Sequence, residues 1–486
     1  MLASYLARPE RGLLALMAAQ IAFWTLAPAL SHSAPPLDVV EMYAWGREGV
    51  LATFKHPNLP GLILEGTRLL TGHVGWPAFL VSQVFIALTF WAVFALGRDL
   101  MDGARALAGT LLLVGVYFFF WPTPEFNHNV AQMPLWAFVM LALWRATTQG
   151  GTGYWLMLGV FAGLSMWAKY SSGVLLVIAA AWMLWDGQAR KRILTPGPWL
   201  ALLAFGLVIT PQVAWLVEHD FAPFAYAARR ASVAEWYEPL EFLLTLAVDH
   251  LPMFILLAAA GFFAKPTTDA PQMPEARAMR YLLLMALGPA LLTAGASIAS
   301  GAGLRASWGA PMVVLSGLLA VALPSARFST ARLRRLTIGA GCFLALTAGL
   351  YFAHMAYGLS FTGRPLRGNW PQAAISADLE GRWAQETGAP LRIVAGEIWN
   401  AGLVGLQSRT PPSILIGGDY SQSPWVTPEE VARDGALIVW RADQQPPPPL
   451  AEFAAGLETH EAVFIFSRFP NVAPITLIYA IRPPAP

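Results

Sequence analysis

Long apolar segments recur along the chain up to about residue 354, separated by short polar stretches. A helix needs roughly 20 apolar residues to cross a bilayer, and fewer where it is partly shielded. By this criterion the sequence predicts about eleven membrane-spanning helices. They cover residues 12–30, 76–97, 106–121, 129–145, 154–168, 171–186, 198–217, 246–264, 281–298, 307–324 and 336–354.

After residue 354 short β-type runs alternate with helix-like stretches. The runs are 391–397, 413–418, 436–441, 462–468 and 475–481, and the helical stretches are 371–387, 398–407, 427–434 and 449–458. This alternation predicts a small α/β domain with a partly parallel sheet. The proline-rich segment 444–449 is expected to be a stiff, extended connector. We therefore divide the chain into a membrane domain, residues 1–354, and an α/β domain, residues 355–486.

Composition supports the membrane class. Hydrophobic residues make up 56% of the 486 residues and charged residues 12%, against roughly 25% charged residues in a soluble domain. The formal net charge of +2, with no basic run among aromatic residues, argues against nucleic acid as a partner. Cys342 is the only cysteine, so a CxxC metal site is absent, and no GxGxxG follows a strand. We expect neither a metal nor a cofactor.

Basic residues collect in alternate loops, and cytoplasmic loops are the ones that carry them. Examples are Arg98, Arg145, Arg190, Arg277 and Arg334. This bias predicts a cytoplasmic N-terminus and an extracytoplasmic C-terminal domain. The segment 12–30 is longer than the apolar part of a cleaved signal peptide, so we interpret it as a retained first span. The alternation also requires Lys169 to lie at an outer turn between two short spans.

The first outer loop, residues 31–75, carries charges that a membrane protein has no structural need for, and we expect short interfacial helices in it. Asp38 and Glu41 lie on one face if the segment is helical, and paired carboxylates raise the pKa of one of them, as a general base requires. The competing interpretation is structural: Asp38 caps a helix and Glu41 closes a capping box.

Further along this loop, Trp45, Lys55, His56 and Pro57 form an aromatic, basic stretch that proline stiffens. Two adjacent cations suit the oxygens of a phosphate or pyrophosphate. The alternative for Lys55 is that its side chain extends to the lipid headgroups.

A second polar patch, EFNHN, opens the fourth predicted span on the outer side. Glu125, Asn127 and His128 are candidates for binding sugar hydroxyls or the acceptor, whereas a helix-capping role explains Asn127 equally well. His128 lacks partners at metal-ligand spacing, which disfavours a metal site.

Three segments together resemble a known family. They are similar to conserved segments of the GT-C glycosyltransferases. The segments are PLDVVEMYAWGREGVLATFKHPNLPG (36–61), AGLSMWAKYSSGVLL (162–176) and LRASWGAPMVV (304–314). The branch is the family 39-like, or protein-mannosyltransferase-like, one, which includes bacterial enzymes that transfer aminoarabinose or galacturonate to lipid A and core sugars. The likeness covers about residues 1–354.

The resemblance implies roles for individual residues. Asp38 matches the proposed catalytic base, and Glu41 competes with it, because many members have an adjacent Asp-Glu pair where this chain reads Val40-Glu41. Pro57-Asn58 replaces a Pro-Pro pair, which predicts a less rigid loop. Residues expected near the donor phosphate or acceptor are Lys55, His56, Lys169, Tyr170, Arg305 and Trp308. For Lys169 the alternative is a side chain that extends to the headgroups, and for Tyr170 and Trp308 it is an interfacial belt.

These observations predict an inverting glycosyltransferase with the GT-C fold in a bacterial inner membrane, with a periplasmic C-terminal domain. Its partners are membrane lipids, a polyprenyl-phosphate-linked sugar, and a lipopolysaccharide or other glycolipid acceptor, with protein a less favoured acceptor. The alternatives are a transporter or flippase for polyprenyl-linked glycolipids, and a non-catalytic member that binds glycolipid. A transporter needs ionisable residues within its spans, and here they lie at the outer edge.

Overall fold

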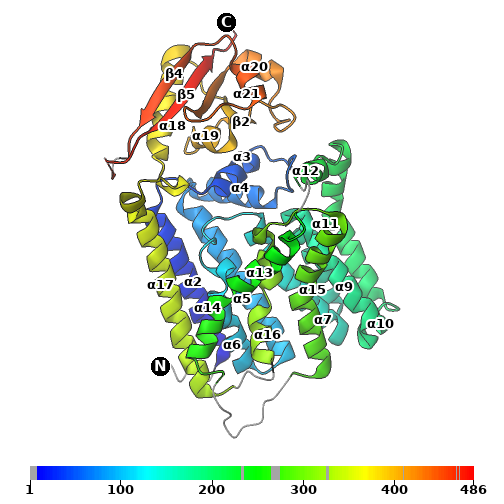
Figure 1. Cartoon of the computed structure of the whole chain (residues 1–486). Coiled ribbons are helices and arrows are strands. Elements are labelled where there is room, and N and C mark those ends of the chain that lie inside the picture. The colour runs from blue at the N-terminus through cyan, green and yellow to red at the C-terminus, as the bar shows by residue number, and fades with distance from the viewer. Residues whose placement is uncertain are drawn as a thin grey trace.

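A computed structural model of the chain describes residues 8–230, 235–263, 274–323, 328–408, 410–466, 468–469 and 471–485. A bundle of long helices carries a small α/β domain at one end, and the short helices α3 and α4 lie between the two (Figure 1). Residues 264 and 324, the expected ends of two spans, lie outside the described part.

Helices lie within every one of the predicted spans, which confirms the helical membrane class. They are α2 (Pro9–Ser31), α5 (Trp76–Leu100), α6 (Gly103–Leu112), α7 (His128–Thr148), α8 (Thr152–Ala168), α9 (Gly173–Trp185), α11 (Pro196–Glu218), α13 (Glu238–Asp249), α14 (Leu251–Ala259), α15 (Ala276–Ser300), α16 (Ser316–Ala322) and α17 (Thr330–Thr362). In the described residues, six helical segments are long and apolar enough to cross a membrane: α2, α5, α11, α13 with α14, α15 and α17.

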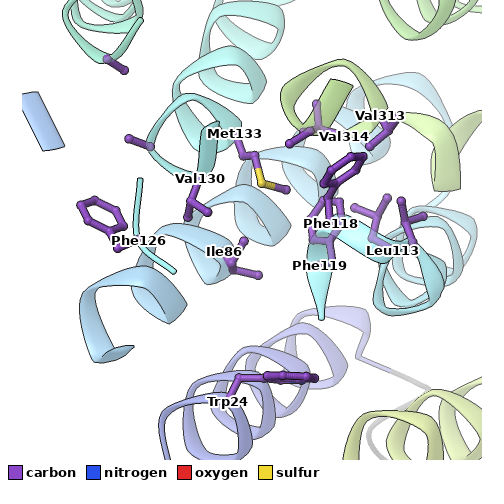
Figure 2. Packing of buried hydrophobic residues seen from close by; sticks show 14 of the residues in the cluster. Trp24, Ile86, Leu113, Phe118, Phe119, Phe126, Val130, Met133, Val313 and Val314 are labelled. Atoms are coloured by element: carbon purple, nitrogen blue, oxygen red, sulfur yellow. The ribbon is translucent and has the colours of Figure 1, made fainter. Parts of the chain in front are cut away.

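The predicted spans 106–121 and 307–324 are not continuous α-helices, and 246–264 is divided at His250 between α13 and α14. The span 106–121 changes after α6 into two 3₁₀ turns, Leu113–Gly115 and Tyr117–Phe119, and 307–324 begins as a 3₁₀ helix, Ala306–Val313. Pro311 lies within the 3₁₀ helix Ala306–Val313 and has no backbone N–H to donate. Phe118, Phe119 and Val313 pack into the centre of the bundle together with Trp24 of α2 (Figure 2). Buried inside the protein, such irregular backbone is tolerated at membrane depth.

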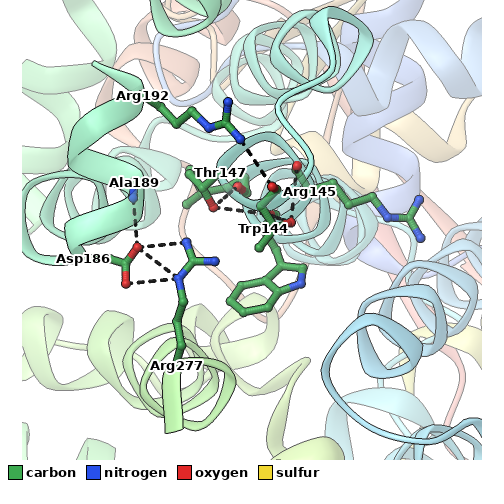
Figure 3. Close-up of polar contacts among 9 residues, drawn as sticks. Trp144, Arg145, Thr147, Asp186, Ala189, Arg192 and Arg277 are labelled. Carbon is green, nitrogen blue, oxygen red and sulfur yellow. Dashed lines mark hydrogen bonds and ion pairs between the residues drawn. The ribbon is translucent and has the colours of Figure 1, made fainter. Parts of the chain in front are cut away.

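Ion pairs join helices at the bundle end opposite the α/β domain. The Arg277 guanidinium of α15 donates to the Asp186 carboxylate, which also caps α10 (Gly187–Arg192) by accepting from the Ala189 backbone (Figure 3). The guanidinium lies 5.0 Å from the centre of the Trp144 ring. Both charged side chains are largely buried, so this pair ties α15 to the junction of α9 and α10.

The first outer loop folds into two helices and a hairpin. The helices are α3 (Leu37–Arg47) and α4 (Leu59–Thr71), so the loop contains short helices as expected. They approach so closely that a Cβ at Gly46 would lie 2.1 Å from the Gly61 carbonyl oxygen. Between them, residues 51–58 turn back on themselves through a bridge between Ala52 and Pro57.

Hydrogen bonds of Asn58 hold the hairpin at Pro57-Asn58, where we expected a looser loop. The Asn58 side-chain amide donates to the carbonyls of Trp45 and Val50, at 3.0 and 2.9 Å. Its own backbone N–H donates to Leu51. Asn58 therefore supplies the restraint that the missing second proline would have given.

The C-terminal part is a five-stranded sheet in the order β2-β1-β3-β5-β4. Its strands are β1 (Ile393–Gly396), β2 (Ser413–Ile416), β3 (Ala436–Arg441), β4 (Thr459–Phe464) and β5 (Ile475–Arg482). Strands β1, β2 and β3 are parallel, and β5 pairs antiparallel with β3 and β4, as predicted for a partly parallel sheet. The helices are α18 (Gln372–Thr387), α19 (Ile398–Leu403), α20 (Pro428–Asp434) and α21 (Pro448–Ala454).

The proline-rich segment is only partly an extended connector. Pro448 and Pro449 form the first turn of α21, where proline needs no donor and its fixed φ suits the helix. The α/β domain rests on α3: a Cβ at Gly402 would lie 2.4 Å from Val40 Cγ1, and the Arg47 guanidinium donates to the Pro412 carbonyl. Helix α17 leads into this domain and ends at Thr362.

Candidate functional site

A cavity of about 670 Å³ lies at the bundle end that faces the α/β domain. Of the candidate site residues named from the sequence, all but Trp45 and Glu125 line this cavity. The ones in its wall are Asp38, Glu41, Lys55, His56, Asn127, His128, Lys169, Tyr170, Arg305 and Trp308. They come from the first outer loop, the start of α7, the break between α8 and α9, and the segment after α15.

Asp38 is in the first turn of α3, and it does not cap the helix. The N-cap is Pro36, which makes no side-chain capping bond, so the capping-box interpretation of Asp38 and Glu41 was wrong. The Asp38 carboxylate instead accepts from the Asn127 amide at 2.8 Å. Asn127 at the same time caps α7, because its side-chain oxygen accepts from the backbones of Asn129 and Val130. The capping interpretation of Asn127 is therefore confirmed, and its contact with a substrate stays a prediction.

Glu41 lies one turn further along α3 and forms an ion pair. The Lys55 ammonium is 2.9 Å from both carboxylate oxygens, so Lys55 does not extend to the headgroups. Burial raises the pKa of Glu41 above its usual value, since little of the residue is exposed. Burial alone lowers the pKa of Lys55, but the adjacent Glu41 carboxylate outweighs it and the pKa of Lys55 is raised.

Lys169 occupies the extended residue between α8 and α9, and its side chain turns inward. Its ammonium donates to the Asn129 side-chain oxygen at 2.7 Å and lies 5.6 Å from the centre of the Trp308 ring. Only 8% of the residue is exposed, so the headgroup alternative was wrong. Burial lowers the pKa of Lys169 to about 8, although the Asp38 carboxylate acts in the opposite direction.

The break that places Lys169 is stabilised by polar groups of α7. The Gln132 amide donates to the hydroxyls of Ser171 and Ser172, and the Trp136 indole also donates to Ser172. Tyr170 beside them donates its hydroxyl to Gln212 at 3.0 Å. Ser172 in turn donates to a carbonyl of α8, so its hydroxyl is hydrogen-bonded entirely within the protein.

The rings of His56 and His128 contact each other in the wall of the cavity, with their centres 4.4 Å apart and their planes tilted by 51°. His128 donates to the Pro57 carbonyl at 3.0 Å. Burial, together with the nearby His128, Lys169 and Lys55, holds the pKa of His56 well below its usual value. The His56 ring is therefore neutral near pH 7, and the expectation of a second cation beside Lys55 was wrong.

Trp45 and Glu125 lie outside this cavity. Trp45 is fully buried behind its wall, with the Lys55 ammonium 5.7 Å from its ring centre, so the structure does not give it the substrate contact that we expected. Glu125 lines a neighbouring cavity of about 640 Å³. Its carboxylate accepts from the Asp38 backbone N–H at 2.8 Å, and burial raises the pKa of Glu125 to about 7.

Several residues of the wall were not identified from the sequence. Tyr226 and Phe224 of α12 (Ala222–Arg230) and Glu238 of α13 line the cavity, and Glu238 accepts from the Leu304 backbone. The amphipathic pattern of α12 was the only local signal for its aromatic residues. Arg305 is exposed on the wall, which leaves its guanidinium accessible to a ligand.

Comparisons with known proteins agree with this architecture. Residues 55–215 match the family model described as dolichyl-phosphate-mannose-protein mannosyltransferase. No curated protein sequence matches significantly. Among solved structures, ArnT from Cupriavidus metallidurans bound to undecaprenyl phosphate has a TM-score of 0.64 at 14% identity, over 96% of this chain and 97% of that one. Its apo state has a TM-score of 0.61 at the same identity and coverage. The resemblance to GT-C proteins is thus confirmed, and the chain has an ArnT-like GT-C fold.

Proposed function

We propose that this protein is a membrane glycosyltransferase that moves a sugar from a polyprenyl phosphate to an acceptor hydroxyl on a lipopolysaccharide or another glycolipid. The observation that carries the proposal is one cavity that holds Asp38 opposite Lys169, with Arg305 exposed on the same wall. The structure of ArnT with undecaprenyl phosphate supports a polyprenyl carrier, since the two chains share a fold along their whole length.

The reaction follows from these groups. The acceptor hydroxyl oxygen attacks the anomeric carbon of the donor, and the bond from that carbon to the phosphate oxygen breaks with its electron pair. The proton of the hydroxyl passes to the Asp38 carboxylate. Lys169 and Arg305 stabilise the negative charge that develops on the leaving phosphate. Direct displacement from the opposite side inverts the configuration at the anomeric carbon.

Asp38 is the better base of the two carboxylates. Glu41 has both oxygens bound to the Lys55 ammonium, so neither oxygen is free to take the proton of an acceptor hydroxyl. Asp38 accepts one hydrogen bond from a neutral amide on Oδ2, so its Oδ1 has no side-chain donor among the described residues. Lys55 is then mainly the counter-ion of Glu41, and the pair shapes the wall between the base and the α/β domain.

The position of the site supports the orientation that we propose. The first outer loop and the α/β domain share one end of the bundle (Figure 1), and the cavity is lined from that loop. Arg145 in the last turn of α7 and Arg277 in the first turn of α15 belong to the other end. By the positive-inside rule the arginine-bearing end is cytoplasmic. The catalytic end then faces the periplasm of a bacterial inner membrane, where a lipid-linked donor needs no nucleotide.

The test is turnover by the purified protein. Reconstituted protein is incubated with undecaprenyl-phosphate sugars and lipopolysaccharide, and the released undecaprenyl phosphate is measured by chromatography. General-base catalysis contributes roughly 10²- to 10⁴-fold, so Asp38→Asn should lose that much rate. Asp378→Asn is the matched control, because Asp378 lies in the α/β domain on a partly exposed ion pair with Arg382.

Full activity of Asp38→Asn would refute the assignment of the base. Binding of the lipid-linked sugar with no release by any variant, wild type included, would instead favour a binding protein or a flippase over an enzyme.

A further inference from the structure

A further crevice of about 450 Å³ lies between the α/β domain and the first outer loop. It is at the edge of the sheet where the three parallel strands end, because Gly417, Glu397 and Arg441 lie at the ends of β2, β1 and β3. In sheets with parallel strands, ligands bind outside the carboxyl ends of the strands. The position alone therefore makes this crevice a candidate ligand site.

The crevice wall has the mixed chemistry that a sugar ring needs. Trp440 and Tyr226 supply aromatic faces, and Asn400, Gln422 and Asp419 supply amide and carboxylate groups. A sugar ring has apolar C–H faces that pack on aromatic rings and hydroxyls that both donate and accept hydrogen bonds. A mostly apolar lipid chain would leave the side-chain oxygen of Asn400 without a partner.

Asn400 gives an independent sign of a missing partner. It lines the crevice and is only 1% exposed. Its amide nitrogen donates to the Glu397 carboxylate at 3.3 Å, but its Oδ1 is buried and accepts no hydrogen bond from the described residues. A buried acceptor without a donor carries a free-energy cost. A hydroxyl or ammonium group of a ligand would remove this cost.

The charges of the wall indicate what kind of sugar fits. The two cations of the wall are already paired, Lys55 with Glu41 and Arg441 with Asp443. Among the described residues, no ion pair neutralises Glu397 or Asp419. The crevice is therefore negative on balance, which favours neutral hydroxyls or an amino group and disfavours phosphate.

We infer that this crevice binds a neutral or amine-bearing sugar of the acceptor. The inference rests on the proposed function, since it makes the crevice the acceptor subsite of the same enzyme. The crevice and the reaction cavity share Glu41, Lys55 and Tyr226 in their walls. A saccharide held by Asn400 and Glu397 thus extends toward Asp38, where its next hydroxyl is deprotonated.

The test measures sugar binding without turnover. Saturation-transfer NMR on the purified full-length protein uses glucosamine and methyl glucoside as probes, with inorganic phosphate as a competitor. This method detects dissociation constants near 1 mM, about −4 kcal/mol of binding free energy. We expect both sugars to bind the wild type, and at least fivefold weaker binding by Asn400→Leu and by Glu397→Gln. Phosphate should displace neither sugar.

The controls separate ligand binding from folding. Glu386→Gln changes an exposed glutamate on α18, outside the crevice, and should bind like the wild type. Glu397 is exposed, so its substitution leaves the core intact even if Asn400→Leu lowers the stability. Equal binding by all variants, or displacement by phosphate, would overturn the inference.

The binding test can also fail or succeed independently of the proposed transferase activity. Asp38 lies outside the crevice wall, so Asp38→Asn should bind both sugars like the wild type while it loses transfer. If Asp38→Asn transferred sugar at the full rate, the assignment of Asp38 as the base would be wrong. Sugar binding by Asn400→Leu and Glu397→Gln would still decide whether the crevice is a sugar site.

Discussion

Two buried groups predict a bell-shaped dependence of kcat/KM on pH. Burial, with the Asp38 carboxylate nearby, raises the pKa of Glu125 to about 7, and burial lowers the pKa of Lys169 to about 8. The pH dependence of kcat/KM reports ionisations of the free enzyme. We therefore expect a rising limb near pH 7, a falling limb near pH 8 and a narrow maximum between them.

The sign of each limb follows from the charges. Above pH 7 Glu125 becomes a carboxylate beside Asp38, and the added negative charge favours transfer of the acceptor proton to this side of the cavity. Above pH 8 Lys169 loses the positive charge that, in the proposed reaction, stabilises the leaving phosphate. For Glu125, the difference between 4.5 and about 7 corresponds to about 3 kcal/mol in favour of the neutral carboxyl group.

The same difference makes stability depend on pH. The unfolded chain releases the proton of Glu125 from about pH 4.5 upward, but the folded chain holds it until about pH 7. Folding is therefore destabilised progressively between these values, by up to about 3 kcal/mol above pH 7. Glu125→Gln removes this loss while keeping an oxygen that accepts from the Asp38 backbone.

The assay is initial-rate kinetics from pH 5.5 to 9.5, with stability followed by chemical denaturation in detergent. The donor is a phosphodiester and does not titrate in this range. Glu125→Gln should lack the rising limb, and Lys169→Arg should move the falling limb to higher pH because guanidinium remains charged. A rising limb near pH 7 that persists unchanged in Glu125→Gln would refute the role of Glu125.

Two further substitutions test the ion pairs. Lys55→Met leaves the buried Glu41 carboxylate without its cation, and should lower the free energy of unfolding by about 2–4 kcal/mol, whereas the double variant Glu41→Gln/Lys55→Met should recover most of it. Denaturation of the wild type and of both variants checks this, and an equal loss in the double variant would contradict it. Arg277→Ala should cost about 3–5 kcal/mol by isolating the buried Asp186 carboxylate, with transfer chemistry unaffected in the folded fraction. A midpoint equal to that of the wild type would show that the pair contributes nothing.

The fold was largely predictable because its signals are local. A run of apolar residues identifies a span wherever the helix that it forms is continuous. Alternation over four to eight residues locates strands, and the parallel pairing of β1, β2 and β3 agrees with helices between them. The breaks in 106–121 and 307–324 depend on packing inside the bundle, which no window of the sequence displays.

The site was predictable in its residues but less so in their states. Asp38, Lys169 and Arg305 were found from short motifs, and the structure brings them to one wall. The ionic partner of Lys55 and the neutral state of His56 arise from the fold of the 51–58 hairpin, so they depend on contacts between distant segments.

One turn of α7 sets the distance between the base and the cation. The Asn127 side chain binds the Asp38 carboxylate, and the Asn129 side chain binds the Lys169 ammonium. These two asparagines are joined by a hydrogen bond, because Asn127 caps the helix through the Asn129 backbone N–H. The acid and the cation are therefore attached to the same rigid helix end, although they come from different segments of the chain. Catalysis by positioned charges requires such preorganisation, since groups fixed before the substrate arrives need not reorganise during the reaction.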